Sequence, residues 1–356
     1  MSYKIADIIS KYTVTRDFDS ANAGQCQWGF AEYGGQEFFI KKFLNPVYPG
    51  EKSPGSEKGK QKRRDQCHEF EKKQLAIIKA LSACGDGGLV VRTIECFKHG
   101  DAYGEHYFKV SQKVDTSSLS DRVHTLEVKK KLFVMLTAAG ALKILHKNGI
   151  IHLDLKPDNI LIQEYGNRLI SKIIDFDSSM IEGRYTESET LVGDPVYYSP
   201  EFARHIATYG ETDLPTKKSD IFSLGLIFCR YWAGSLPVFP PSYNYAYEAV
   251  LKGEKLSIQK ASMEAAIKPK EIKASRLSGS LIKPGFVATE IDPTNAGVQQ
   301  LIQKMLVSNP NTRLSISEVH HSLKHLFHHG TLPKLDVEKE SSEPKTKLTF
   351  GKNLRR

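Results

Sequence analysis

The sequence predicts an α+β protein with two lobes, a small β-rich N-terminal lobe and a larger helical C-terminal lobe. Short runs rich in β-branched and aromatic residues dominate residues 1–114. Long apolar patterns with helical spacing dominate residues 115–330. The two parts meet near residues 114–118, so we expect a cleft between them. A chain of 356 residues is long enough to bury a substantial core in this arrangement.

The N-terminal lobe is predicted to combine several strands with one long helix. The expected strands are residues 12–15, 26–31, 37–41, 89–97 and 106–114. A Gly-Gly pair at 34–35 indicates a hairpin turn, and residues 45–59, rich in Pro, Gly and Ser, are expected to form a loop. The helix covers residues 60–81. The apolar side chains expected near one of its faces are Phe70, Leu75, Ile78 and Leu81.

The C-terminal lobe is predicted to be mainly helical. A long apolar helix covers residues 126–148 and ends at Asn148 and Gly149, a typical helix stop. Short strands at 160–162 and 170–174 flank a Gly-Asn turn. Helices continue after Ser219, except in the polar, irregular stretch 253–295. Residues 331–356 are charged and poor in apolar residues, so we expect a disordered basic tail.

Composition and the apolar pattern indicate the cellular compartment in which we expect the protein. The longest apolar run, residues 132–142, is too short to span a bilayer, and residues 1–20 lack the apolar core of a signal peptide. The 5 cysteines are scattered without a CxxC pair, which favours a reducing compartment and a cytoplasmic protein. The net charge of +9 comes without a nucleic-acid motif, so we interpret it as a solvated surface that also favours phosphate-bearing ligands.

The run His-Leu-Asp-Leu-Lys-Pro-Asp-Asn at residues 152–159 carries the chemistry. Phosphoryl transfer needs a carboxylate to accept the proton of the attacking hydroxyl, a cation on the migrating phosphate, and oxygen ligands for magnesium. Asp154 supplies the base and Lys156 the cation. Asn159 supplies one magnesium ligand, and Asp175 supplies the second, because the residues between them suffice for a β-hairpin that returns to the same place.

Together these motifs resemble the eukaryotic-type serine/threonine protein kinases, over about residues 12–328. Ser-Pro-Glu at 199–201, the helix at 218–225 and the segment 306–313 follow in the family's order. The resemblance implies a bilobal protein-kinase fold, ATP and Mg²⁺ as cofactors, and a protein substrate. It also implies that Asp220 braces the catalytic loop, and that Glu201 and Arg313 form a buried ion pair. Lys156 is typical of the serine/threonine subgroup, and the compact activation segment resembles the eukaryotic-like kinases of bacteria.

The N-terminal lobe matches the same family less completely. By resemblance, Lys41 contacts the α- and β-phosphates of ATP, and Glu71 pairs with it, with Glu69 as the alternative on the same helix. The phosphate-covering loop falls at residues 19–26, where Gly24 is the one family glycine present.

The adenine contacts implied by the resemblance come from two places. Cys26 occupies the position of the family's valine, and it is either a nucleotide contact or an ordinary buried cysteine. Gln112 and Val114 belong to the hinge that hydrogen-bonds adenine through its backbone, behind a small gatekeeper at Ser111.

Three residues depart from the family pattern. Leu153 replaces the arginine that receives a phosphorylated activation loop in many members, so we expect no requirement for loop phosphorylation. Asp177 replaces a glycine and is either part of a tuned metal site or a solvent-facing turn residue. Asp194 replaces a threonine and is expected to accept a hydrogen bond from Lys156.

Two other functions remain open. A small-molecule kinase shares the Asp…Asn…Asp logic but lacks the counterparts of Lys156, Glu201 and Arg313. A pseudokinase scaffold would fit the eroded glycine loop and Asp177, yet it has no need to retain the catalytic set. The sequence identifies neither the protein substrate nor the oligomeric state. Thr186, Ser188 and Thr190 are candidate autophosphorylation sites or ordinary loop hydroxyls.

Overall fold

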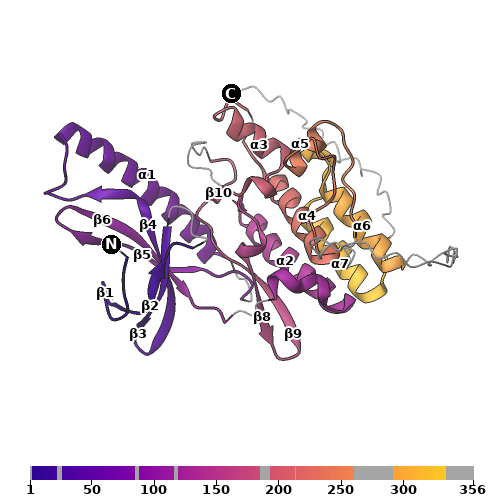
Figure 1. Cartoon of the computed structure of the whole chain (residues 1–356), viewed down its shortest axis with the longest axis horizontal. Coiled ribbons are helices and arrows are strands. Elements are labelled where there is room, and N and C mark those ends of the chain that lie inside the picture. The colour runs from indigo at the N-terminus through magenta and orange to yellow at the C-terminus, as the bar shows by residue number, and fades with distance from the viewer. Residues whose placement is uncertain are drawn as a thin grey trace, which may run out of the picture.

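The computed structural model consists of a β-rich N-terminal part and a helical later part that lie side by side (Figure 1). The structure describes residues 2–21, 26–84, 88–115, 119–184, 193–212, 214–259 and 292–333. The predicted α+β class is confirmed. Part of the predicted joint (116–118) and most of the predicted tail (334–356) lie outside the described residues, so the lobe boundaries remain predictions.

The N-terminal part is a six-stranded antiparallel sheet in the order β1-β2-β3-β4-β6-β5. Its strands are β1 (Ile8–Ile9), β2 (Tyr12–Asp19), β3 (Cys26–Tyr33), β4 (Gln36–Pro49), β5 (Thr93–Asp101) and β6 (Gly104–Gln112). Alternating side chains such as Tyr12, Val14 and Phe18 of β2 point to one face and bury a small core. The Gly34-Gly35 turn joins β3 to β4 as predicted, with positive φ at both glycines.

Strand β4 is longer than predicted, because residues 45–49 continue the strand where a loop was expected. After a register shift beyond Lys42, Val47 pairs with His106 and Tyr48 pairs with Glu105 of β6. Pairing with β6 therefore outweighs the turn-forming composition of this segment, and the loop prediction was wrong for these residues.

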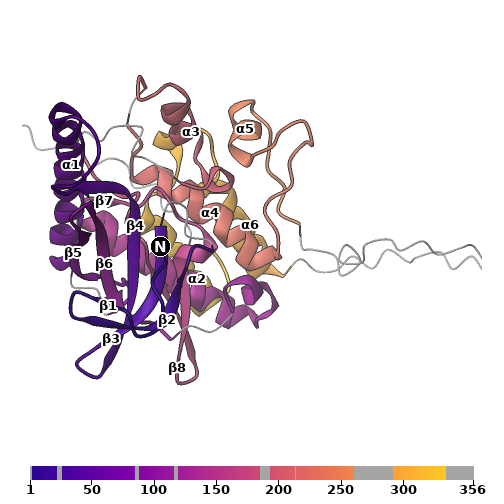
Figure 2. The ribbon, with the colours of Figure 1, turned by 60° about the vertical axis from the view of Figure 1, so that its left-hand side comes forward.

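Helix α1 (Glu57–Ser82) packs against β4 and runs along one side of the sheet (Figure 2). Ser56 caps its start, where the Oγ atom accepts a hydrogen bond from the Gly59 amide. The buried face holds Cys67, Gln74, Ile77 and Leu81. Leu75 is 62% exposed, so its predicted place on the apolar face was wrong. At 100° per residue Leu75 lies about 120° from Leu81 around the helix, away from the sheet.

The later part packs its helices around one large core. Its main elements are α2 (Val128–Lys147), α3 (Pro200–Ala207), α4 (Lys217–Ala233), α5 (Ala246–Leu251), α6 (Pro293–Met305) and α7 (Ile316–His329). Helix α4 is buried along most of its length between its neighbours. Helix α2 contacts α7 and the hairpin of β8 (Ile160–Tyr165) and β9 (Arg168–Ile173). In the described part of the chain, none of the helices has both the length and the apolarity needed to cross a membrane.

One short strand pairing connects this core to the segment at residues 152–159. Strand β7 (Ile150–Ile151) pairs with β10 (Met180–Ile181), and it leads directly into the run at 152–159. Helix α2 ends where predicted, and Gly149 with φ 72° turns the chain into β7. The fold thus brings residues before and after the β8–β9 hairpin to the same place.

Candidate active site

The catalytic loop is braced by one buried carboxylate, that of Asp220 at the start of α4. Its Oδ2 atom accepts hydrogen bonds from the His152 amide and from His146 Nε2, each at 2.8 Å. Its Oδ1 atom accepts one from the Leu153 amide at 2.9 Å. Leu153 has φ 64°, a conformation that non-glycine residues rarely adopt, and these hydrogen bonds hold it there. The predicted brace is confirmed.

Asp154 is oriented by groups on both sides. Asn159 Nδ2 donates to the Asp154 carbonyl at 2.7 Å and to its Oδ2 atom at 3.0 Å. The Asp194 amide donates to Oδ1 at 3.0 Å. Lys156 Nζ lies 3.4 Å from Oδ2. The structure therefore brings Asp154, Lys156 and Asn159 together in the arrangement predicted from the run.

The β8–β9 hairpin returns the chain to this loop. The Ile174 amide donates to the Asn159 carbonyl at 3.0 Å, and His152 Nε2 donates to the Ile174 carbonyl at 2.9 Å. These bonds place Asp175 beside the catalytic loop with φ 61°. Two segments that are separated in sequence by the hairpin are thus fixed against each other, as predicted.

The oxygen atoms at this point fit Mg²⁺. The amide nitrogen of Asn159 donates to Asp154, which leaves its side-chain oxygen available as a ligand, and the nearby segment adds the Asp175 carboxylate. Magnesium prefers such hard oxygen ligands and takes only one or two of them from protein, with phosphates and water completing the set. Within the described residues no cluster of three or more His, Cys, Asp or Glu side chains offers a fuller cage.

Lys41 on β4 reaches across to this site. Its Nζ atom lies 2.8 Å from Asp175 Oδ2 and 2.6 Å from Asp177 Oδ2. Burial lowers the pKa of Lys41, but the two carboxylates outweigh burial and raise it, so the ammonium stays charged. Burial, followed by the charge of Asp177, raises the pKa of Asp175.

Asp177 bridges two lysines. Lys109 on β6, which stands directly opposite Lys41 in the sheet, contacts its Oδ1 atom. Burial works to raise the pKa of Asp177, but the ammonium groups of Lys109 and Lys41 together lower it below the usual range. The side chain is only 18% exposed, so the interpretation of Asp177 as a solvent-facing turn residue was wrong.

The predicted pair between Lys41 and Glu71 was also wrong. The Glu71 carboxylate accepts a hydrogen bond from the Tyr107 hydroxyl at 2.7 Å and lies 3.3 Å from Lys98 Nζ. Glu69 pairs with Lys72 on the exposed face of α1. In the described part of the chain neither glutamate contacts Lys41. Burial lowers the pKa of Lys73 on α1 to about 8, against the opposing charge of Asp177.

Leu153 and Asp194 are both accounted for by local packing. Leu153 is 4% exposed and packs in a small apolar cluster with Ile151, Met180 and Phe202. Asp194 caps the 3₁₀ turn Pro195–Tyr197, where its Oδ1 atom accepts from the Val196 amide at 3.0 Å. The expected hydrogen bond from Lys156 to the Asp194 side chain is not formed between these described residues, because that carboxylate is turned into its own cap.

The nucleotide contacts expected of Cys26, Gln112, Val114 and Gly24 stay predictions. Cys26 is buried beside Phe43, Cys67 and Tyr107, and burial raises the pKa of its thiol to about 12. Gln112 ends β6, and Val114 follows it. Gly24 lies outside the described residues, as do the candidate autophosphorylation sites Thr186, Ser188 and Thr190.

Sequence reasoning missed Lys109, which contributes a second ammonium to the site. The sequence carried a signal, because Lys109 interrupts the apolar run from Tyr107 to Val110. In the structure this lysine is only 8% exposed. A lysine inside a buried strand requires a counter-ion. The extra carboxylate at Asp177 supplies it.

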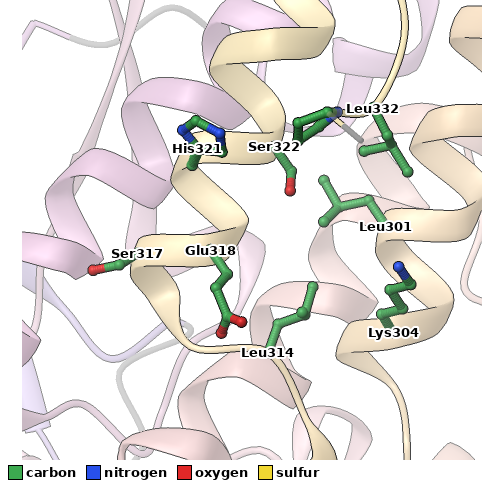
Figure 3. A pocket seen from close by; sticks show the side chains of 9 residues that line it. Leu301, Lys304, Leu314, Ser317, Glu318, His321, Ser322 and Leu332 are labelled. Atoms are coloured by element: carbon green, nitrogen blue, oxygen red, sulfur yellow. The ribbon is translucent and has the colours of Figure 1, made fainter. Parts of the chain in front are cut away.

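A separate hollow of about 250 Å³ lies between α6 and α7 in the helical part (Figure 3). Leu301, Leu314 and Leu332 face it, together with polar side chains of α7 such as Glu318 and His321. None of the predicted site residues lines it, so it does not belong to the catalytic arrangement.

The fold and the braced Asp–Lys–Asn loop resemble the arrangement that phosphoryl-transfer enzymes use. The family model of the protein kinase domain matches residues 57–327, and this chain belongs to that family.

Similar proteins are named as kinases, and two of the three described here are named as serine/threonine-protein kinases. The ovarian-specific serine/threonine-protein kinase Lok of Drosophila melanogaster is 32% identical over 135 residues, which cover 38% of this chain and 27% of Lok. The serine/threonine-protein kinase PrkC of Bacillus subtilis is 32% identical over 136 residues, 37% of this chain and 19% of PrkC. Aurora kinase of Eremothecium gossypii is 28% identical over 201 residues, 56% of this chain and 43% of that protein. The chain thus spans less than half the length of each of these relatives.

Proposed function

We propose that this chain is an ATP- and Mg²⁺-dependent protein kinase that phosphorylates serine or threonine hydroxyls of a protein substrate. The observation that carries the proposal is the joining of two segments: the loop that holds Asp154, Lys156 and Asn159, and the hairpin that returns Asp175 to it. Each residue type that phosphoryl transfer needs is present within this arrangement.

The proposed chemistry assigns one task to each residue. The substrate hydroxyl oxygen forms a bond to the γ-phosphorus of ATP while the bond to the bridging oxygen of ADP breaks, and Asp154 accepts the hydroxyl proton. Lys156 neutralises charge on the migrating phosphoryl group. Asn159 and Asp175 would hold Mg²⁺, which when bound offsets negative charge on the phosphates. Lys41 would contact the α- and β-phosphates.

Two features favour a protein substrate. Arg313 forms a bidentate pair with Glu201 at 2.7 and 3.1 Å, beneath the segment that follows the activation segment. Two of the similar proteins are named as serine/threonine-protein kinases. In a small-molecule kinase neither the Glu201–Arg313 pair nor Lys156 would be expected, so that alternative is weakened.

The test uses the full chain with Mg²⁺ and radiolabelled ATP. We expect label to reach the chain itself or a generic basic protein, and phosphoamino-acid analysis to find phosphoserine or phosphothreonine. Asp154→Asn should lower the rate by about 10²–10⁴-fold, the usual contribution of a positioned base. Asp158→Asn is the matched control, because this exposed aspartate lies in the same loop.

Three results would decide against the proposal. Undiminished transfer in Asp154→Asn removes the assignment of the base. Binding of MgATP without any transfer by the wild-type chain indicates a pseudokinase. Transfer to small hydroxyl compounds but not to protein indicates a small-molecule kinase.

A further inference from the structure

Lys41 is paired in an unusual way for its proposed role. Two carboxylates from the segment after β9 surround it, Asp175 at 2.8 Å and Asp177 at 2.6 Å. The protein-kinase resemblance led us to expect a glutamate from helix α1 in this place. Glu71, the expected partner, is bonded to Tyr107 and Lys98 instead.

We propose that Asp177 is the positioning residue for Lys41, in place of a glutamate from α1, and that Lys109 holds Asp177 in that position. The inference rests on the proposed function, because it assigns the residue that places the phosphate-binding lysine. It goes further in stating that the geometry of this lysine does not depend on a salt bridge to α1.

Asp175 is less suited than Asp177 to serve as the lasting partner of Lys41. Its Oδ2 atom contacts Lys41, and Mg²⁺ held by the same carboxylate would draw on the negative charge that this contact uses. Asp177 has no such conflict, since Lys109 occupies its Oδ1 atom and Lys41 lies at its Oδ2 atom. Asp177 therefore remains available to hold Lys41 while Asp175 binds metal.

The sheet register explains why a carboxylate is needed between these lysines. Lys41 on β4 and Lys109 on β6 are direct cross-strand neighbours, so their side chains leave the sheet on the same face. Like charges in this position repel each other, and the two side chains are only 13% and 10% exposed. One carboxylate that bridges both ammonium groups removes the repulsion and fixes the position of each.

Helix α1 is held on the sheet by other means. Glu71 accepts the Tyr107 hydroxyl and pairs with Lys98, which are residues of β6 and β5. Glu71 therefore anchors α1 to the neighbouring strands and does not pair with Lys41.

The experiment compares Asp177→Asn with Glu71→Gln in the full chain. Steady-state rates with a generic protein acceptor give kcat and KM for ATP, and calorimetry gives the affinity for MgATP. We expect Asp177→Asn to lower kcat/KM for ATP by about 10- to 100-fold, because a small misplacement of a phosphate-binding group has effects of this size. Glu71→Gln should leave both kinetic constants within about twofold of wild type.

Two further variants separate positioning from folding. Asp177→Glu keeps the charge and should recover part of the loss in kcat/KM. The double variant Lys109→Met with Asp177→Asn removes the buried cation together with its counter-ion, so it should fold and still show the lowered kcat/KM for ATP. Wild-type kinetics in this folded double variant would overturn the inference.

The reciprocal result would also overturn the inference: a slow Glu71→Gln and an unchanged Asp177→Asn. If the wild-type chain transfers no phosphoryl group, the proposed function fails, and MgATP affinity then decides the inference alone. A loss of affinity of about tenfold in Asp177→Asn but not in Glu71→Gln supports it, and equal affinities in both overturn it.

Discussion

The catalytic loop and Lys41 reach the same site from different parts of the molecule, and different forces hold them. The loop is fixed within the helical part by backbone amides that donate to the buried carboxylate of Asp220. The Lys41 side chain is held by ion pairs with Asp175 and Asp177, and these pairs join the sheet to the segment after β9. Backbone hydrogen bonds specify direction as well as distance, whereas ion pairs tolerate a change of partner.

The residues that match the family model cover only part of this site. The match begins at residue 57, the first residue of α1, so it includes the catalytic loop but not Lys41. Asp220 and the loop at residues 152–159 lie inside the matched residues, and so do Lys109 and Asp177. On the side built from ion pairs, Asp175 and Asp177 contact Lys41 where the resemblance predicted a helix glutamate.

The largest effect is expected from Asp220→Ala. The substitution leaves three buried donors without an acceptor: the amides of His152 and Leu153 and the His146 ring. Hydrogen bonds to a charged group contribute about 1.5–3 kcal/mol each, so we expect a loss of about 5 kcal/mol in the free energy of unfolding. Urea unfolding measures this loss. A variant of near-native stability would show that the amides do not depend on Asp220.

A somewhat smaller effect is expected from Arg313→Met. Arg313 is 2% exposed and pairs with Glu201, so its removal leaves a buried carboxylate without its cation. Breaking one partner of a buried pair costs about 3–5 kcal/mol. The double variant Glu201→Gln with Arg313→Met is the control and should recover part of this loss. No recovery would mean that packing of the arginine, rather than its charge, is what stabilises the fold.

The accuracy of the predictions from sequence also differs between these two regions of the molecule. The hairpin of β8 and β9, its return to the loop at residues 152–159 and the end of α2 were predicted correctly, because their signals lie within a few neighbouring residues. Asp220 and the pair of Glu201 with Arg313 are distant in sequence, yet they belong to motifs with a fixed order, and the resemblance supplied them.

The errors concern features that depend on partners brought together by the sheet. Strand β4 extends through Pro49 because β6 pairs with it, and composition alone predicted a loop. The helix of residues 57–82 was recognised. Whether one of its glutamates reaches Lys41 depends on how the helix is rotated against the sheet, and the sequence does not give that rotation. Asp177 could be explained only once Lys41 and Lys109 were seen to be cross-strand neighbours, since their distance in sequence hides the charge balance.

A third prediction concerns acid. Burial opposes ionisation of Glu201, but Arg313 lowers the pKa of its carboxyl below the usual 4.5. A lowered folded-state pKa contributes stability above the unfolded-state value and loses it as pH falls through the folded-state pKa. We therefore expect the stability advantage of wild type over Glu201→Gln to be full at pH 7. It should shrink by about 1–2 kcal/mol as pH falls below 4.5, measured by urea unfolding at several pH values. An advantage that is constant down to pH 3 would contradict a charge-based role for the pair.

The smallest effect separates two glutamates of helix α1 that stand two residues apart. Glu71 is 30% exposed and accepts the Tyr107 hydroxyl, whereas Glu69 is 70% exposed and pairs with Lys72 on the same helix. Glu71→Gln should lower the free energy of unfolding by about 1–1.5 kcal/mol, since a charge-assisted hydrogen bond to the sheet is weakened in a partly solvated place. Glu69→Gln should change it by less than about 0.5 kcal/mol, as is usual for an exposed pair.

Thermal and urea unfolding of the two α1 variants measure the difference. A stability loss in Glu71→Gln with unchanged kinetics would show that Glu71 anchors α1 to the sheet and is not needed for the reaction. Equal stabilities would mean that the Tyr107 contact does not hold the helix. In that case Phe70, whose ring lies 4.9 Å from that of Tyr107, and the buried Ile77 and Leu81 would carry the docking of α1 alone.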